Sequence, residues 1–396
     1  MTGVFLAAGW VLPVSAAPIR DGAVAVEDGR IAWVGPAETA ERSGAEVRDL
    51  GAGVLLPGLV NAHCHLELSH LAGAVAAGSG FSEWVGALVS ARSSESGEQV
   101  RAAAGSAALG MAAAGTAAVG DVSNRLEHLD LLAAAGLRAV VYHELIGWDP
   151  ARAEAVLAAA EARVAALKAL PGVAVELAAH APHSVSPELF AALRRRGGPA
   201  SLHLAESPDE ERFLRSGDGP WCGFLESRGL GHVPFVAPGT SAVRYADSLG
   251  VLHPGLLAVH CVQATPDDCR LLAERGVSVA VCPRSNRFLG VGLPPVAEML
   301  AAGVNVCVGT DSLASSPSLD VLADLRALHA ELPDMPPSRL LEMATVNGAR
   351  ALGLGDLGAL APGKTAALAF LAAQRRIKDP LAYLLHSTVR ATRLVA

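Results

Sequence analysis

Short β-prone runs that alternate with helix-length segments constrain the fold of this chain more than any other feature. The runs cover residues 54–65, 116–123, 138–147, 173–182, 200–206, 256–263, 277–286 and 305–312. Apolar runs separated by helical patterns are typical of parallel β-α-β units. Eight such units make a (β/α)8 barrel, which has about 250 residues in its usual form. We therefore expect an α/β fold with a TIM-type barrel.

Histidines gather at the ends of these runs. The chain has 13 histidines, and those at or just beyond the end of a run are His63, His65, His143, His180, His183, His203 and His260. In a barrel of this type the carboxyl ends of the strands line the active site. So many imidazoles at one face indicate a functional site there rather than chance placement in loops.

A metal site is the simplest use for this group. His63 and His65 are two residues apart, so on a strand their side chains point the same way. His203, His260 and Asp311 end other runs, and together these residues offer a nitrogen and oxygen ligand set. Such a set suits Zn²⁺, Fe²⁺ or Mn²⁺ rather than calcium.

Glu206 lies three residues beyond His203. A carboxyl group there would reach a water molecule at the metal and the substrate, and would move protons between them. The alternative is a solvated carboxylate at the start of the helix that follows Pro208, where the next residues are also acidic.

Composition excludes several other classes of protein. The net charge is −8 and the sequence pI about 5.9, so a nucleic-acid partner is not expected. Residues 104–120 are uncharged but consist mainly of Ala and Gly, too weakly apolar to span a membrane. The apolar segment 4–17 lacks the preceding basic residues of a signal peptide. Six cysteines without a C-x-x-C pair argue against disulfides and a cysteine-ligated zinc site, and favour a cytoplasmic location.

Four segments of the chain resemble the amidohydrolase superfamily. They are residues 56–65, the His203 segment, Val259-His260 and Gly309-Thr310-Asp311-Ser312, and the resemblance covers nearly the whole chain. It implies a barrel, here residues 54–354, beside a small β-sandwich that both chain ends form, here residues 1–53 and 355–396. The resemblance and the pattern of β-prone runs therefore predict the same fold, an α/β barrel.

The superfamily divides by metal count, and its two-metal members use a lysine on a barrel strand. The lysines of this chain are Lys168, in a helical stretch, and Lys364 and Lys378, beyond the barrel. The resemblance therefore implies one divalent metal ion, Zn²⁺ or Fe²⁺. It assigns the metal ligands as His63, His65, His203 and Asp311.

The same resemblance assigns the catalytic roles. Asp311 would also take a proton from the attacking water, and His260 would form a hydrogen bond to it. Glu206 would protonate the ring nitrogen next to the carbon under attack. This layout resembles that of the deaminases of purine, pyrimidine and triazine rings, in which ammonia leaves.

Three further segments, 81–85, 179–186 and 282–289, resemble the deaminases of adenosine-containing substrates. The first choice is aminodeoxyfutalosine deaminase of menaquinone synthesis. The predicted substrate contacts are Glu83 for the ribose, Trp84 for stacking, His180 for the purine, and also His183, Arg284 and Asn286. Arg284 or Arg287 would pair with the benzoate carboxylate. A structural ion pair for either arginine, and a buried core position for Trp84, stay open as alternatives.

Other functions stay open at this point. One is deamination of S-adenosylhomocysteine and methylthioadenosine, or of guanine or cytosine. A second is removal of chloride from a triazine-like ring by the same set of metal ligands and catalytic residues. From another class, the chain would be a non-catalytic barrel that binds a ligand. The partner expected is a small-molecule substrate, with neither nucleic acid nor membrane, and a homodimer is left open.

Overall fold

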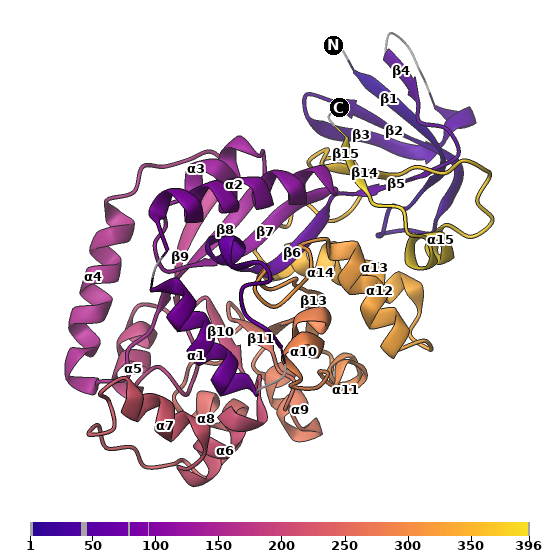
Figure 1. The fold of residues 1–396 in the computed structure, drawn as a ribbon. Helices are drawn as coiled ribbons and strands as arrows, with labels where there is room; N and C mark the ends of the chain where they lie inside the picture. The colour runs from indigo at the N-terminus through magenta and orange to yellow at the C-terminus, as the bar shows by residue number, and fades with distance from the viewer. Residues whose placement is uncertain (1–2, 41–45, 78–79, 94, 395–396) are drawn as a thin grey trace.

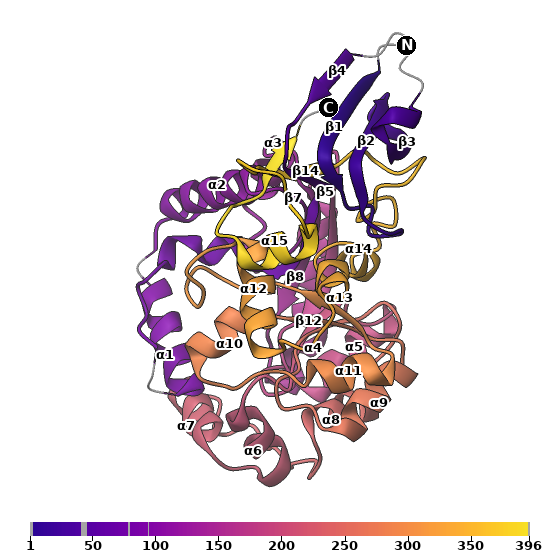
Figure 2. The ribbon, with the colours of Figure 1, turned by 90° about the vertical axis from the view of Figure 1, so that its right-hand side faces the viewer.

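In the computed structural model of the protein, residues 3–40, 46–77, 80–93 and 95–394 are described. Figure 1 shows a large part built of parallel strands and helices, with a smaller sheet at one end that contains both chain termini. Figure 2, turned by a quarter, shows the same smaller sheet above the larger part. The chain thus leaves the small sheet once and returns to it.

The parallel strands form two sheets in the described part of the chain. The first has the order β6 (Leu59–Cys64), β7 (Thr116–Ser123), β8 (Arg138–Leu145) and β9 (Val173–Ala179). The second has the order β10 (Ser201–Leu204), β11 (Leu257–His260), β12 (Ser278–Val281) and β13 (Asn305–Val308). Every neighbouring pair is parallel, so the predicted α/β class with parallel strands is confirmed.

Main-chain hydrogen bonds also join the two sheets to each other. Between β9 and β10, Ala200 N donates to Leu177 O (2.9 Å) and His203 N to His180 O (2.8 Å). After β13, the amides of Thr310 and Asp311 donate to His63 O at the end of β6 (3.0 and 3.1 Å). The residues after the last parallel strand therefore lie beside the end of the first.

Helices connect successive strands. Their bounds are η1 (Ala37–Thr39), η2 (Leu66–Leu71), α1 (Phe81–Arg92), α2 (Gly97–Ala113), α3 (Leu129–Ala134), η3 (Pro150–Arg152), α4 (Ala153–Ala165), α5 (Pro187–Arg195), α6 (Pro208–Ser216), α7 (Pro220–Ser227), α8 (Ala242–Ser248), α9 (Pro266–Glu274), α10 (Pro283–Leu289), α11 (Val296–Ala302), α12 (Val321–Glu331), α13 (Pro337–Met343), α14 (Val346–Ala351) and α15 (Pro380–His386). Within the described residues, no helix is both long and apolar enough to cross a membrane.

Three of these helices begin with a capping residue at the end of the loop that follows a parallel strand. Ser186, Ser207 and Thr265 accept hydrogen bonds from the amides three residues on, and a proline follows each of them. A capping side chain satisfies an amide that the first helical turn leaves free, and proline at the first position is already in helical geometry. The caps therefore fix where the loops after β9, β10 and β11 end.

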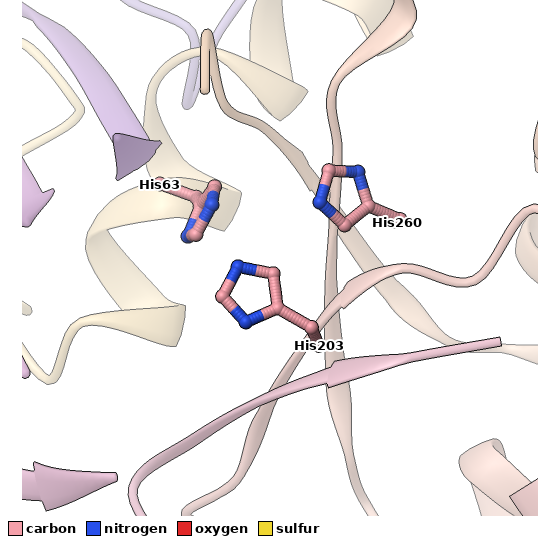
Figure 3. A group of neighbouring side chains, drawn as sticks. All are labelled: His63, His203 and His260. Carbon is pink, nitrogen blue, oxygen red and sulfur yellow. The ribbon is translucent and has the colours of Figure 1, made fainter. Parts of the chain in front are cut away.

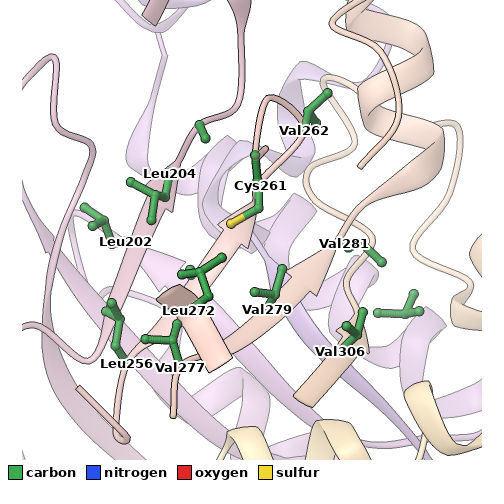
Figure 4. Close-up of a cluster of buried hydrophobic side chains, with 14 of the residues drawn as sticks. Leu202, Leu204, Leu256, Cys261, Val262, Leu272, Val277, Val279, Val281 and Val306 are labelled. Carbon is green, nitrogen blue, oxygen red and sulfur yellow. The ribbon is translucent and has the colours of Figure 1, made fainter. Parts of the chain in front are cut away.

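The second parallel sheet is buried on both faces. Every residue of β10, β11 and β12 is buried, which is typical of parallel strands covered by helices. Figure 4 shows the apolar cluster between this sheet and its helices, which includes Leu202, Leu204, Val279, Val281 and Val306. Truncating such a leucine to alanine costs about 2–5 kcal/mol, so the strand ends that carry the histidines stand on a rigid base.

Both chain ends form the smaller sheet. Its strands are β1 (Val4–Val11), β2 (Ile19–Glu27), β3 (Arg30–Pro36), β4 (Glu46–Asp49), β5 (Val54–Pro57), β14 (Leu368–Leu371) and β15 (Thr392–Leu394). The order is β15-β14-β5-β1-β2-β3, with β4 paired to β1. The described strands make one mixed sheet, and the two-layer sandwich stays a prediction, as does the division into domains.

The predicted run 54–65 contains two strands rather than one. β5 pairs with β1 and β14 in the smaller sheet, whereas β6 pairs with β7. Gly58 separates them, and its amide donates to Ala367 O (2.8 Å). A Cβ atom at Gly58 would lie 2.5 Å from Cβ of Ala117, so only glycine fits where the chain passes from one sheet to the other.

Candidate metal centre and active site

Three histidines face one another at the carboxyl ends of the parallel strands. His63 comes from β6, His203 from β10 and His260 from β11, and Figure 3 shows their rings turned toward a common point. The ring centroid of His63 lies 5.0 Å from that of His203 and 5.8 Å from that of His260. Potential ligand atoms of the three lie within 4.8 Å of one another.

His65 and Asp311 complete the predicted ligand set. The Nε2 atoms of His65 and His203 are 3.2 Å apart. Oδ1 of Asp311 lies 3.6 Å from Nε2 of His65 and 3.8 Å from Nε2 of His63. The structure therefore brings together the predicted ligands His63, His65, His203 and Asp311, with His260 beside them.

The chemistry of these atoms fits a divalent metal ion. His63 is fully buried, and within the described part of the chain neither of its ring nitrogens has a hydrogen-bond partner. A buried polar atom without a partner is costly, and a cation would satisfy it. Imidazole nitrogens with a carboxylate oxygen are the ligands that Zn²⁺ and Fe²⁺ take in proteins.

Hydrogen bonds on the far side of two rings fix which nitrogen faces the centre. Nδ1 of His203 lies 3.1 Å from the carbonyl oxygen of His180, which can only accept, so this nitrogen carries the proton. Nδ1 of His260 lies 2.9 Å from Oδ1 of Asn286 and donates to it. Both rings therefore present Nε2 as a lone pair to the centre, the arrangement that histidine ligands need.

The backbone is strained at three points around this centre. His260, Asp311 and Ala205 have φ values of 71°, 57° and 50°. The left-handed region is unfavourable for residues with a Cβ atom, at about 1–3 kcal/mol each, and such strain concentrates at functional sites. Here it turns each strand end sharply enough to direct its side chain inward.

Burial keeps the imidazoles neutral. It lowers the pKa of His65 to about 3 and that of His260 to about 4, and it lowers the pKa of His203 well below its ordinary value. Burial alone would raise the pKa of Asp311, but the neighbouring imidazoles of His63, His65 and His260 hold that pKa well below its usual range. Neutral imidazoles and an ionised carboxylate are the forms that bind metals.

Glu206 is buried, with 6% of its surface exposed. The alternative of a solvated carboxylate at a helix start is therefore wrong for this residue. Oε1 of Glu206 lies 3.3 Å from Nε2 of His260. Burial raises the pKa of Glu206 well above its usual range, and Asp311 and Glu210 add to this. A carboxyl group that keeps its proton at neutral pH can act as an acid.

Two of the predicted substrate residues lie close to the centre. The ring of His180 is 5.2 Å from that of His203 between centroids, and the ring of His183 is 5.7 Å from that of His180. His183 stacks on Trp221 of α7, with centroids 4.1 Å apart. The two histidines thus form a second row of imidazoles outward from the ligands.

The two predicted substrate contacts on α1, Glu83 and Trp84, differ in burial. Glu83 is exposed, and no hydrogen bond or ion pair joins it to the centre among the described residues. Trp84 is 7% exposed and belongs to the main apolar cluster. The structure therefore favours the core position that was left open for Trp84 over stacking on a ligand.

Arg284 and Asn286 have other partners in the structure. The guanidinium of Arg284 donates to Oδ2 of Asp324 (2.8 and 3.0 Å) and to the hydroxyl and carbonyl oxygens of Ser318. The ion-pair alternative is therefore favoured for Arg284, because its donors are already used. Asn286 is fully buried, and its Oδ1 accepts a hydrogen bond from His260, so it orients that ring, while its contact with a substrate stays a prediction.

Several residues of the site were not predicted. Oδ2 of Asp311 accepts hydrogen bonds from Ser285 Oγ (2.5 Å) and Ser315 Oγ (2.8 Å). Oε1 of Glu144, at the end of β8, lies 3.5 Å from Nδ1 of His203. Glu144 ends a predicted run, which is a signal that could have found it, whereas a serine beside a catalytic carboxylate leaves no mark in the sequence.

Comparison with known proteins agrees with this geometry. The profile of the amidohydrolase family matches residues 54–392, and that of an imidazolonepropionase-like composite domain of bacteria matches residues 22–43. A 5-methylthioadenosine/S-adenosylhomocysteine deaminase of Moorella thermoacetica is 32% identical over 382 residues, 90% of this chain and 83% of that protein. An aminodeoxyfutalosine deaminase of Deinococcus radiodurans is 32% identical over 335 residues, 80% of this chain and 76% of that protein.

A solved structure is similar over almost the whole chain. It is described as an adenosine deaminase from Xanthomonas campestris with bound zinc. Its TM-score is 0.79 at 28% identity, over 98% of this chain and 90% of that one. The matched profile, these relatives and the converging histidines and carboxylates together show that this chain belongs to the amidohydrolase family and is a hydrolase that acts on carbon–nitrogen bonds.

Proposed function

We propose that this protein removes the amino group from an adenine-containing nucleoside by hydrolysis at a single-metal centre. The observation that carries the proposal is the convergence of His63, His65, His203 and Asp311. Glu206 lies 3.3 Å from His260, which faces the same centre. We place this centre at the mouth of a (β/α)8 barrel formed by the two parallel sheets, because hydrogen bonds link them at both junctions.

The four ligands would hold one Zn²⁺ or Fe²⁺ ion, which would make a water molecule acidic enough to attack at neutral pH. Asp311, ionised at neutral pH, accepts the proton of the attacking water. The oxygen of that water forms a bond to the amine-bearing ring carbon while Glu206 protonates the adjacent ring nitrogen. Asp311 then passes its proton to the amino group, and the carbon–nitrogen bond breaks to release ammonia. Glu206 regains a proton from the new hydroxyl group as the carbonyl forms. His260 faces the same centre, and its Nε2, which presents a lone pair, is placed to accept a hydrogen bond from the attacking water.

Aminodeoxyfutalosine is the first substrate that we propose. The similarity of residues 81–85 and 282–289 to that branch and the Deinococcus relative support it. We no longer propose Arg284 as the partner of the benzoate carboxylate, since its guanidinium forms an ion pair with Asp324. Arg287 takes its place as the candidate partner of the benzoate, because its side chain is 54% exposed and its one ion pair is with the surface residue Glu331.

A second candidate is the deamination of methylthioadenosine and S-adenosylhomocysteine. The Moorella relative, which is similar over a larger share of the chain, favours it. The loss of Arg284 as a carboxylate partner favours it too, since methylthioadenosine has no carboxylate to bind.

Ammonia release from the metal-loaded protein tests both candidates. We would offer aminodeoxyfutalosine, methylthioadenosine, S-adenosylhomocysteine and guanine in parallel and follow the change in purine absorbance. Turnover of one nucleoside at least a hundredfold faster than guanine is expected, and turnover of guanine alone would overturn the proposal. Glu206→Gln should lower kcat by about 10²–10⁴ with unchanged metal content, while Glu226→Gln, at an exposed position, should change neither.

A further inference from the structure

Glu210 is a fully buried carboxyl group in the first turn of α6. Its Oε2 accepts a hydrogen bond from the backbone amide of Glu206 (2.8 Å). Its Oε1 faces Nδ1 of His183 at 3.8 Å. Oε1 of Glu210 and Nδ1 of His183 are both buried, and neither has a hydrogen-bond partner among the residues that the structure describes. Buried polar atoms almost always have one, so each is the natural partner of the other.

One face of the His183 ring also has a stacking partner. This face stacks on Trp221, with an interplanar angle of 24°. Trp221 in turn meets Phe81 of α1 edge to face, with centroids 6.0 Å apart. The stack fixes the plane of the imidazole but allows two orientations in that plane, related by a rotation of the ring by half a turn about its Cβ–Cγ bond. A partner at one ring nitrogen is what selects between the two orientations.

We propose that Glu210 is a positioning residue that holds a proton on Nδ1 of His183 and, through its other oxygen, the backbone of Glu206. Nε2 of His183 is thereby directed to the substrate. This inference rests on the proposed function for the part that makes His183 a substrate contact. One carboxylate would then set the geometry of both Glu206, which delivers protons, and His183, which contacts the substrate.

The strained backbone explains why Glu206 needs this support. Ala205, directly before it, has a φ of 50°. The amide of Gln263 donates to Ala205 O (2.8 Å), and the bond from Glu206 N to Glu210 holds the other side of the same turn. Together these bonds stabilise a turn that the chain would otherwise avoid.

Only a carboxylate can serve both donors. The amide of Glu206 and the protonated Nδ1 of His183 each need an acceptor, and an ionised Glu offers two. Glutamine offers one acceptor oxygen and one donor NH₂ group. In Glu210→Gln we expect the oxygen to keep the short bond to the Glu206 amide, so that the NH₂ group meets Nδ1 of His183. The proton must then leave Nδ1 and move to Nε2.

Two measurements test the inference. Nitrogen-15 NMR of histidine-labelled, metal-loaded protein without substrate should show Nδ1–H of His183 in the wild type and its loss in Glu210→Gln, with the signal assigned by a His183→Asn variant. This readout needs no turnover, so it separates failure of the inference from failure of the proposed function. A wild-type His183 without a proton on Nδ1 would overturn the inference.

Kinetics give the second measurement. Glu210→Gln should raise KM about tenfold, the equivalent of one hydrogen bond, with kcat within about threefold and metal content unchanged. Glu211→Gln is the matched control. Glu211 is also buried on α6, but its oxygens bind the amide of Ala242 and the side chain of Arg215. If Glu211→Gln raised KM as much as Glu210→Gln, the effect would be structural and the inference wrong.

Discussion

The Nε2 atoms of His65 and His203 lie 3.2 Å apart, although His65 follows the first strand of one parallel sheet, β6, and His203 lies on the first strand of the other, β10. His203 carries its proton on Nδ1, so its Nε2 presents a lone pair to His65. Burial disfavours a charged imidazole at either position. A metal ion between the two nitrogens satisfies both without placing a charge on either ring.

His65→Ala should therefore lose the metal. We expect metal content, measured by mass spectrometry after dialysis, to fall from one equivalent to below one tenth. The thermal unfolding temperature should fall to that of wild-type protein treated with a chelator, because an ion at a hundred times its Kd contributes about 2.7 kcal/mol. His232→Ala, at an exposed residue, is the control. Full metal retention in His65→Ala would show that the ligand set is wrong.

The stability of the metal-free protein should fall on acidification, and His260 should account for part of this. Burial lowers the pKa of His260 from its ordinary value of 6.5 to about 4. Between these values the unfolded chain binds a proton that the folded chain does not. Stability is therefore lost as the pH falls from 6.5 to 4, by up to about 1.4 kcal/mol per pH unit for this one group.

His260→Gln tests this assignment. Denaturant unfolding of chelator-treated protein at several pH values gives the slope of the free energy of unfolding against pH. This slope should be shallower in the variant by the equivalent of up to one bound proton. The exposed His232 provides the control, since His232→Gln should leave the slope as in the wild type. Equal slopes in wild type and His260→Gln would contradict the assigned pKa shift.

Much of the fold could be predicted from the sequence because parallel strands buried on both faces are nearly continuous apolar runs. The runs that contain β7 and β8 begin with these strands and end at or within two residues of their ends. The run 54–65 could not be divided correctly. Both of its halves are equally apolar and buried, so hydrophobicity does not show that Val54–Pro57 pairs with β14, more than three hundred residues along the chain.

The metal ligands could be predicted for a different reason. Each lies near the end of a parallel strand or in the loop directly after it. The carboxyl ends of parallel strands meet at one face, so position in the sequence predicts position in space. The same logic failed for Arg284. It lies just beyond β12, but its partner Asp324 belongs to α12, and no pattern along the chain predicts which helix supplies a buried carboxylate.

The ion pair of Arg284 and Asp324 leads to a prediction about stability. Both side chains are largely buried, with 14% and 0% exposed, and burial raises the pKa of Asp324 to about 6 despite the arginine. Removing one partner of a buried pair leaves an uncompensated charge at a cost of about 3–5 kcal/mol. We expect a loss of this size for Arg284→Met in denaturant unfolding.

The kinetics of the same variant separate a structural role from a substrate contact. Below its unfolding temperature, Arg284→Met should keep KM for the best nucleoside within about threefold of the wild type. For stability, the comparison is Arg287→Ala, since the exposed ion pair of Arg287 with Glu331 should contribute no more than about 1 kcal/mol to the free energy of unfolding. A large rise in KM for Arg284→Met, with little loss of stability, would restore the discarded substrate contact.

The two serine hydroxyls on Asp311 lead to the last prediction. Ser285 and Ser315 both donate to Oδ2, while Oδ1 faces His63 and His65. The hydroxyls therefore decide which oxygen is free for the metal. Either single alanine variant leaves Oδ2 one donor, whereas the double variant leaves it buried with none from this pair. We expect each single change to weaken metal binding by about tenfold, within the range for ligand-supporting residues.

The double variant, Ser285→Ala with Ser315→Ala, should weaken binding by more than the product of the single effects, because residues that share one partner are coupled. Chelator competition gives the Kd of the metal for each protein. Ser316→Ala is the control, since this buried hydroxyl donates instead to the carbonyl of Ser318. Strictly multiplicative effects would mean that each serine acts independently and that Asp311 is oriented by its strained backbone alone.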